Sequence, residues 1–455
     1  MADYLPHTQD EVEAMLAFLG LQSLDDLFAH IPAAIRLASG ATGLPQGRSE
    51  PDVADEFAQF TRANRATASQ LVCFAGGGAY DHEVPNVVKS LASRSEFVTA
   101  YTPYQPEVAQ GVLQALFEYQ TLVSRLSGLP VANASLYDGA TALVEALNLA
   151  GGSTGRSTML VSAGVHPHWR AVVRTFAQGT GHEVVEVPLV NGLTDWSVVD
   201  VDEAAAVVVA YPNYLGVLED MAGARAHATR LGGLFVVAGD PVAAGVLRTA
   251  GDWGADVYVG EGQPFGMALS FGGPYLGLFA IAAEHVRRLP GRIVGETLDT
   301  NGRRAFVTTL RAREQDIRRE KATSNVCTNQ ALMAVTAAIQ LGWLGTAGLR
   351  QVAVASATGA HALFDVVTAI EGVEPLVSAP FLREFAVRLA RPADEVIATM
   401  AADGILAGLS VASLTGGPDP SVGDDPSTIL LVAVTERRTQ LELDAYVESL
   451  RKAVR

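Results

Sequence analysis

The run LFVVAGD at residues 234–240 decides how this sequence folds. Its first five residues are apolar without alternation, and so is the run AVVVA at 206–210. A strand with one wet face alternates apolar and polar residues, whereas a continuously apolar strand is covered on both faces, as in parallel sheets flanked by helices. Further short apolar or β-branched runs lie at 158–162, 183–188, 257–259 and 276–281, with helical patterns at 169–178 and 223–231 between them. We therefore predict a large α/β domain with a mostly parallel sheet.

Asp240 directly follows this central strand. Ligand crevices in open α/β sheets form beyond the carboxyl ends of the strands. In enzymes that use pyridoxal phosphate, an Asp in such a place pairs with the pyridine nitrogen.

The strand at 257–259 runs into GEGQPFG at 260–266, where that architecture carries the lysine that forms a Schiff base with the cofactor. Here the only lysines of the chain are Lys89, Lys321 and Lys452, and none lies within 57 residues of Gln263. A Schiff base requires a primary amine, which glutamine and arginine do not provide. The sequence therefore predicts that this chain cannot run internal Schiff-base chemistry by itself.

Three parts are expected along the chain. Residues 1–70 are predicted to form a helical N-terminal segment, 71–325 the large α/β domain, and 326–455 a small α+β domain. In the last part, helices are expected at 327–344, 346–369, 393–403 and 440–454, and strands at 384–389 and 429–434.

Composition narrows the class of protein. With 455 residues, 49 % hydrophobic and 18 % charged, the chain is typical of a compact enzyme. A net charge of −17 argues against nucleic-acid binding and against anionic membranes. No uninterrupted apolar run reaches the roughly 18 residues of a membrane span, and the acidic N-terminus is unlike a signal peptide. We expect a cytoplasmic protein.

Positive charge is concentrated in one stretch. Residues 287–321 hold ten basic and five acidic side chains, a net charge of +5, which leaves −22 for the rest of the chain. Two interpretations stay open: a solvated helix face, or a subunit interface or carboxylate-binding wall.

Two further segments carry weaker signals. His166 and His168 are spaced like a ligand pair, but no Cys or carboxylate cluster accompanies them, so no metal is predicted. Asp138 and Thr141 open an apolar helix after the small residues 132–135. A helix start of this kind can bind phosphate, although the interpretation of Asp138 as a simple helix cap is favoured.

The segment 99–111, which contains Tyr101-Thr102-Pro103-Tyr104-Gln105, resembles the hallmark of the N-terminal half, or alpha subunit, of the glycine decarboxylase P-protein family. Further segments resemble that family in the same order, at 118–121, 132–142, 164–167, 212–216, 271–274, 289–297 and 311–328. Together they cover most of the chain, and its length matches the split form of the family.

The resemblance implies a fold-type-I pyridoxal-phosphate enzyme fold with a smaller C-terminal domain. It also implies glycine dehydrogenase (aminomethyl-transferring) activity, in which glycine is decarboxylated and its aminomethyl group passes to lipoylated H-protein. In the split form the lysine and the cofactor belong to a beta subunit. The alpha subunit binds no cofactor and walls the active site in an α2β2 assembly.

The resemblance also implies site residues, although no catalytic residue and no metal ligand. The expected active-site wall is Tyr101, Tyr104, Gln105, His166 and Asn213. The expected vestige of a cofactor cleft is Asp138, Thr141, Asp240 and Gln263, with Gln263 at the place of the lost lysine. The less specific interpretations are a packed Tyr-Pro turn for the tyrosines and a core histidine for His166.

Two rival functions remain. A self-sufficient aminotransferase or desulfurase of the same fold requires the lysine that is missing here. A non-catalytic or recruited paralogue, acting as a scaffold or regulatory partner of another pyridoxal-phosphate enzyme, is the alternative that the sequence leaves open.

Overall fold

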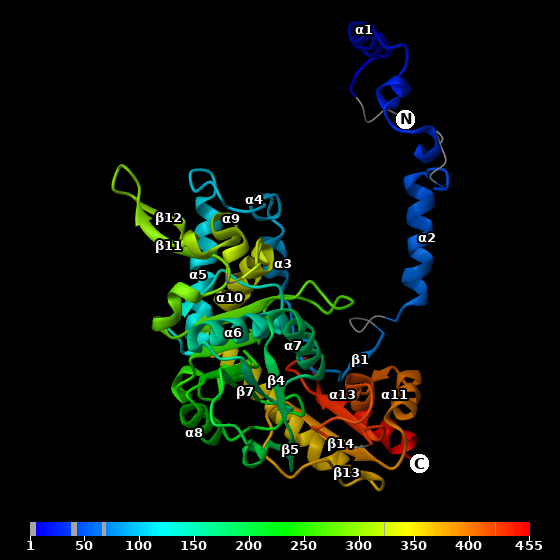
Figure 1. The fold of residues 1–455 in the computed structure, drawn as a ribbon. Helices are drawn as coiled ribbons and strands as arrows, with labels where there is room; N and C mark the ends of the chain where they lie inside the picture. Colours follow the sequence, from blue (N-terminus) through cyan, green and yellow to red (C-terminus); the bar gives the residue numbers. More distant parts are fainter. Residues whose placement is uncertain (1–5, 38–42, 66–69, 323, 424) are drawn as a thin grey trace. The chain divides into compact units, whose positions relative to one another are not determined.

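A seven-stranded sheet in the order β2-β10-β9-β8-β7-β3-β4 forms the centre of the fold (Figure 1). The structure is a computed structural model that describes residues 6–37, 43–65, 70–322, 324–423 and 425–455. The strands are β2 (Val131–Ala132), β3 (Thr158–Ser162), β4 (Glu183–Val187), β7 (Ala206–Tyr211), β8 (Leu234–Gly239), β9 (Val257–Glu261) and β10 (Gly277–Ile281). β10 is antiparallel to both of its neighbours, and β9, β8, β7, β3 and β4 run parallel to one another. The predicted, mostly parallel α/β sheet is confirmed.

Both faces of this sheet are buried. Val207, Val209 and Val237 pack into a core with helices α5 (Gln110–Ser127) and α8 (Met221–Leu231). The alternate residues Val208 and Val236 pack on the other face with α6 (Gly139–Thr154) and α7 (Pro167–Thr180). This two-sided burial is the physical reason for the continuously apolar runs in the sequence.

The long helix α10 (Ala331–Val367) follows the large sheet and is interrupted at Gly345, which has φ 59° and ψ −175°. The two predicted helices on either side of residue 345 are therefore confirmed. Among the described helices, α10 is the one long and apolar enough to cross a membrane by length and composition alone. It packs against α5, α3 (Asn86–Ala92) and α13 (Gln440–Ala453), as a core helix does.

A second sheet, in the order β13-β14-β17-β16, lies in the C-terminal part of the chain. Its strands are β13 (Val373–Pro375), β14 (Glu384–Leu389), β16 (Leu409–Ser410) and β17 (Ile429–Ala433), and the helices are α11 (Ala393–Ala402), α12 (Val411–Thr415) and α13. The predicted strands and helices of this region are confirmed to within one residue. A further strand pair joins β1 (Val72–Cys73) to β15 (Ile405–Leu406).

Two compact units are distinguished, Met1–Arg65 and Ala66–Arg455. The first contains α1 (Gln9–Leu19), η1 (Leu24–Phe28), η2 (Ala33–Ile35) and α2 (Glu50–Ala63). Thr8 caps α1 with a reciprocal bond to Glu11. The division of the second unit at residue 325 stays a prediction.

The basic stretch 287–321 is not a single helix, which corrects the solvated-helix interpretation. It runs from η6 (Ala283–Arg288) through the hairpin of β11 (Ile293–Leu298) and β12 (Arg304–Thr309) to three short helical turns. These turns are η7 (Arg311–Arg313), α9 (Gln315–Arg318) and η8 (Arg319–Lys321). Figure 1 shows the hairpin projecting from the body of the unit Ala66–Arg455.

The remaining elements are α4 (Ser95–Val98), β5 (Leu189–Val190), β6 (Leu193–Thr194), η3 (Trp196–Val198), η4 (Ala243–Gly245) and η5 (Gly251–Trp253).

Candidate functional site

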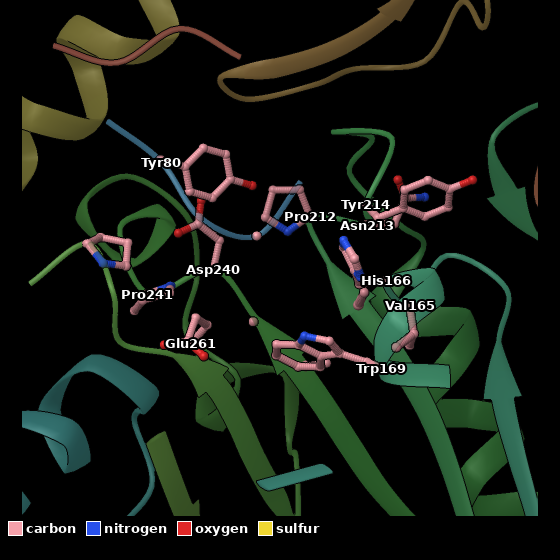
Figure 2. A pocket seen from close by; sticks show the side chains of 15 residues that line it. Tyr80, Val165, His166, Trp169, Pro212, Asn213, Tyr214, Asp240, Pro241 and Glu261 are labelled. Carbon is pink, nitrogen blue, oxygen red and sulfur yellow. The ribbon is translucent and has the colours of Figure 1, made fainter. Parts of the chain in front are cut away.

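A cleft opens beyond the carboxyl ends of the parallel strands (Figure 2). It encloses about 560 Å³, part of which is open to solvent. Its lining comes from the ends of β7, β8 and β9, from the start of α7 and from the segment before α3, and includes Gly78, Tyr80, Val165, His166, Trp169, Pro212, Asn213, Tyr214, Asp240, Pro241, Glu261 and Pro264. The cleft lies where ligands bind in open α/β sheets.

The carboxylate of Asp240, at the end of β8, is paired with a buried arginine. Asp240 Oδ2 accepts bonds from Nε of Arg383 at 2.9 Å and lies 2.8 Å from its Nη2. Arg383 stands just before β14 in the C-terminal sheet and is 2 % exposed. Its guanidinium also stacks on Tyr80, 3.7 Å from the ring centroid. A planar guanidinium suits this combination of a two-point ion pair and stacking.

The guanidinium of Arg383 also contacts a buried histidine and, through it, a glutamate. Arg383 Nη1 bonds to Nε2 of His82, and His82 Nδ1 lies 2.6 Å from a carboxylate oxygen of Glu436. Burial and then the Arg383 charge lower the pKa of His82. A neutral His82 with its proton on Nδ1 satisfies both partners, because it accepts from the arginine and donates to Glu436.

Gln263 occupies the expected lysine position after β9 and is 1 % exposed. Its Oε1 accepts from the backbone N–H of Tyr80 at 2.9 Å, and its Nε2 donates to the carbonyls of Tyr80 and Met267 at 3.0 and 2.8 Å. The amide is therefore used fully within the fold, and it ties the segment around Tyr80 to the end of β9.

Two buried carboxyl groups lie beside it. Burial raises the pKa of Glu261 to about 8, against three backbone N–H donors that lower it. Burial also raises the pKa of Glu384 to about 7, although its oxygens accept from Gly77 N–H and from the hydroxyl of Tyr80. Glu261 lines the cleft, and Glu384 supports it through the hydroxyl of Tyr80.

The N-terminus of α6 is closed by the chain's own groups. Asp138 is the N-cap, its Oδ1 accepting from Thr141 N–H at 2.8 Å, so the capping interpretation is confirmed. Glu261 Oε2 accepts from Gly139 N–H at 3.0 Å. The indole of Trp169 packs so closely on Gly139 that a Cβ there would overlap the ring. Asp138 and Thr141 do not line the cleft itself.

His166 and Asn213 both line the cleft, and each accepts hydrogen bonds from the backbone. His166 caps α7, and its Nδ1 accepts from the backbone N–H of His168 at 3.1 Å. Burial lowers the pKa of His166 to about 4, so the ring is neutral, and because Nδ1 accepts a bond the proton is on Nε2. Asn213 is 3 % exposed, and its amide bonds to Gly192, Glu219 and two backbone N–H groups.

The hallmark loop lies outside this cleft. Tyr101 is 82 % exposed and Tyr104 40 % exposed, and Gln105 is exposed as well. Arg292 fixes the position of Tyr104: its Nη2 donates to the tyrosine hydroxyl at 2.8 Å, and its guanidinium lies 4.7 Å from the ring centroid. The loop therefore presents its tyrosines to the outside of this chain.

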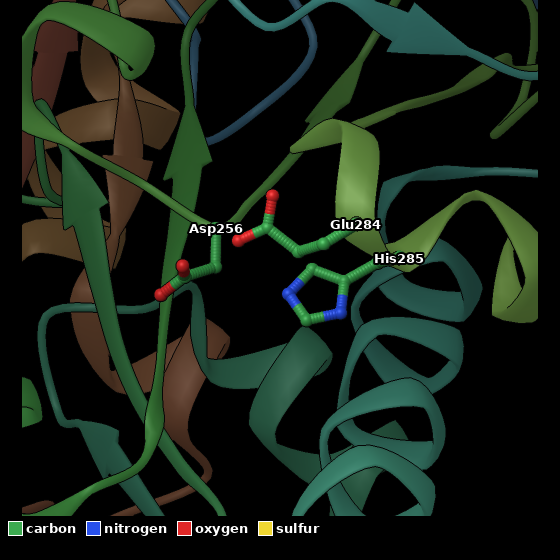
Figure 3. Close-up of side chains that lie close together, drawn as sticks. All are labelled: Asp256, Glu284 and His285. Carbon is green, nitrogen blue, oxygen red and sulfur yellow. The ribbon is translucent and has the colours of Figure 1, made fainter.

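One group of side chains has the spacing of metal ligands (Figure 3). Ligand atoms of Asp256, Glu284 and His285 lie within 4.8 Å of one another. Asp256 Oδ2 already accepts from Phe235 N–H at 2.7 Å and from Arg225 at 3.0 Å. Because the guanidinium already supplies a cation here, the geometry favours an ion pair over a metal. The absence of a metal stays a prediction.

Several residues of the cleft were missed from the sequence. Tyr80, Trp169 and Glu261 line it from three segments of the chain, and Arg383 and Glu384 contact its lining from a fourth. Only Glu261 had a local signal, as an acid at the end of the apolar strand β9.

The fold defines the class of protein. The chain has the fold of fold-type-I pyridoxal-phosphate enzymes: a cysteine desulfurase from Escherichia coli superposes with a TM-score of 0.62 at 17 % identity, covering 87 % of this chain and 98 % of that one. Residues 2–415 match the family described as glycine cleavage system P-protein.

Individual relatives agree with that match. "Probable glycine dehydrogenase (decarboxylating) subunit 1" of Chlorobium chlorochromatii is 46 % identical over 451 residues, and that of Geobacillus kaustophilus is 45 % identical over 450; each alignment covers 98 % of both chains. A crystal structure of glycine decarboxylase (P-protein) of the glycine cleavage system, in inhibitor-bound form, superposes with a TM-score of 0.90 at 44 % identity, covering 99 % of this chain and all of that one. The chain belongs to the glycine cleavage system P-protein family, and within it to the alpha-subunit, or subunit 1, type.

Proposed function

We propose that this chain is an obligate half-enzyme. With a beta subunit that carries the Schiff-base lysine and pyridoxal phosphate, it forms an α2β2 enzyme that decarboxylates glycine and transfers the aminomethyl group to lipoylated H-protein. The alpha-subunit relationship supports the assignment, and the division of labour between the subunits rests on one observation in this chain.

That observation is the lysine inventory. Lys89, Lys321 and Lys452 are all exposed, and none of them lines the cleft. The position that follows β9 holds Gln263, which is buried and fully hydrogen-bonded. Covalent attachment of the cofactor aldehyde needs an amine in the cleft, and this chain has none there.

We assign the hallmark loop to the wall of the active site in the partner subunit. Tyr101 and Tyr104 are exposed, and Arg292 fixes the ring of Tyr104 from below. Aromatic side chains with a polar tip are enriched in interfaces, where the ring packs and the hydroxyl bonds. Gln105 belongs to the same loop, whereas His166 and Asn213 belong to this chain's own cleft.

The rival functions are less well supported. A self-sufficient aminotransferase or desulfurase needs a lysine in the cleft. A recruited scaffold or regulatory paralogue is not favoured, because the curated relatives are named for the glycine enzyme along nearly their whole length. We propose a cytoplasmic location, with which the two free cysteines, Cys73 and Cys327, are compatible.

Glycine–bicarbonate exchange in the presence of lipoylated H-protein tests the proposal. The rate is measured with this chain alone, with a beta subunit alone, and with the two mixed. Activity only in the mixture is the expected result. Exchange by this chain alone would overturn the argument from lysine, and a mixture no faster than beta alone would overturn the assignment as an obligate half.

A further inference from the structure

Pyridoxal phosphate is recognised at three points in enzymes of this fold. A lysine amine takes the aldehyde, an Asp pairs with the protonated pyridine nitrogen, and backbone N–H groups at a helix N-terminus bind the phosphate. In this chain each of the three corresponding places is already used by another side chain.

The Asp position is neutralised from inside. Asp240 Oδ2 is shared by Nε and Nη2 of Arg383, and its Oδ1 accepts from Val242 N–H at 3.0 Å. A pyridinium would have to displace a guanidinium that is 2 % exposed and bonded on two sides. Removing one partner of such a buried pair leaves an uncompensated charge, so the displacement is strongly unfavourable.

The phosphate position is closed by two carboxyl groups and a ring. In the first turn of α6, Gly139 N–H donates to Glu261 and Thr141 N–H donates to Asp138. Both N–H donors are thereby occupied, so a phosphate would first have to displace these two carboxyl groups. The indole of Trp169 packs on Gly139. Figure 2 shows this ring in the same cleft as Glu261.

We propose that this cleft is filled by its own side chains, with Arg383 standing in for the pyridinium, the Glu261 carboxyl group for the phosphate and Gln263 for the lysine. The inference rests on the proposed half-enzyme function and goes beyond it. Loss of the lysine is then not the only obstacle to the cofactor, and the residues present do not fit pyridoxal phosphate even non-covalently.

Pyridoxamine phosphate separates these two obstacles. It carries the pyridine ring and the phosphate but an amine in place of the aldehyde, so it needs no lysine and does not react with the exposed ones. In calorimetric titration of the unmodified chain, no saturable binding is expected up to millimolar ligand. Saturable binding in the micromolar range would show an open cleft and overturn the proposal.

The Gln263→Lys variant provides the second arm. After incubation with pyridoxal phosphate and desalting, it is expected to stay colourless, because Arg383 and Glu261 still occupy the other two places. A stoichiometric yellow complex would overturn the proposal. The far-UV circular dichroism spectrum and the exchange activity with the beta subunit verify that the variant is folded.

The failure of this inference is distinguishable from failure of the proposed function. If the chain binds pyridoxamine phosphate but still needs the beta subunit for exchange, only the proposal of a filled cleft is wrong. Exchange by this chain without a partner would sink the half-enzyme instead.

Discussion

Arg292 is an arginine almost withdrawn from water, with 3 % of its surface exposed. Besides Tyr104, it meets Asn329 Oδ1 at 3.4 Å, and its Nε lies 3.8 Å from Glu314. Burial raises the pKa of Glu314, and the Arg292 charge lowers it. The arginine thus ties the hallmark loop to the segment after β12.

Arg292→Lys is predicted to misplace Tyr104, because an ammonium group lacks the planar fork that bonds and stacks at once. Exchange activity of the mixed subunits should fall about tenfold to a hundredfold, the range for small displacements of positioning groups. Size-exclusion chromatography should show the same amount of assembled complex. Loss of activity that merely follows loss of assembly would contradict a positioning role, and Tyr104→Phe, which removes only the hydroxyl, is the milder control.

Glu145 on α6 gives a stability prediction at the same scale. Burial raises its pKa from 4.5 to about 7, so the folded state holds its proton more tightly than the unfolded state does. Stability is therefore lost as pH rises from about 4.5 through about 7. Above that window the free energy of unfolding of Glu145→Gln should exceed that of the parent chain by about 1 kcal/mol, after allowance for partial exposure. Below the window the variant and the parent chain should be equally stable.

Thermal unfolding at pH 5 and pH 8.5 makes this comparison. Glu118→Gln, at an exposed position of α5, is the matched control and should change stability little at either pH. An Glu145→Gln variant that is no more stable at the higher pH would show that the carboxyl group reaches solvent.

Asp240 was predictable from the sequence because a parallel sheet gathers the ends of its strands at one edge. His166 and Asn213 were expected from the family resemblance instead, and all three residues line the cleft. Arg383 was not predictable, because it reaches Asp240 across 143 residues of sequence and nothing before β14 marks it as buried. The filled cleft is thus a tertiary property that local patterns do not contain.

At the scale of elements, α10 shows how one glycine breaks a helix. Gly345 has a positive φ that L-residues avoid, whereas Gly342, three residues earlier, is helical, and both have open space where a Cβ would go. Gly345→Ala is predicted to destabilise by about 1–3 kcal/mol, because its φ and ψ lie in a region that is essentially restricted to glycine, and Gly342→Ala to stabilise by up to about 1 kcal/mol. Opposite shifts of the denaturation midpoint in urea are expected; equal shifts would show that α10 straightens without cost.

The central strands β7 and β8 were predictable because burial on both faces makes their sequences continuously apolar. The hairpin β11–β12 was missed: its burial is complete at Ile293 and Val294 but is lost from Glu296 to Leu298. A two-stranded ribbon that leaves its sheet and projects outward has no uniform apolar face to mark it. The same region turned the expected surface helix into a hairpin and three short turns.

At the scale of the unit Ala66–Arg455, the Asp240–Arg383 pair joins the two main sheets. Asp240 follows β8 of the seven-stranded sheet, and Arg383 precedes β14 of the C-terminal sheet. A second link passes through Tyr80, whose hydroxyl donates to Glu384 at 2.9 Å. Gln263 completes this link by holding the backbone of Tyr80 to the end of β9. If the cleft is filled as proposed, these links hold the two sheets in one arrangement without any cofactor between them.

Arg383→Met is therefore predicted to destabilise the chain by about 3 kcal/mol, because it leaves Asp240 without its cation in a largely buried place. Arg388→Met is the matched control: it makes the same change five residues further along, within β14, but Arg388 is half-buried and, among the described residues, its printed bond is to the hydroxyl of Thr428 at 3.2 Å, so a cost within about 0.5 kcal/mol is expected. Urea denaturation of both variants gives the comparison. Equal losses would mean that the charge pair does not hold the sheets together. A loss confined to Arg383→Met would mean that the Asp240–Arg383 pair both joins the two sheets and excludes the cofactor. Closing the cleft and joining the sheets would then be the work of the same two side chains.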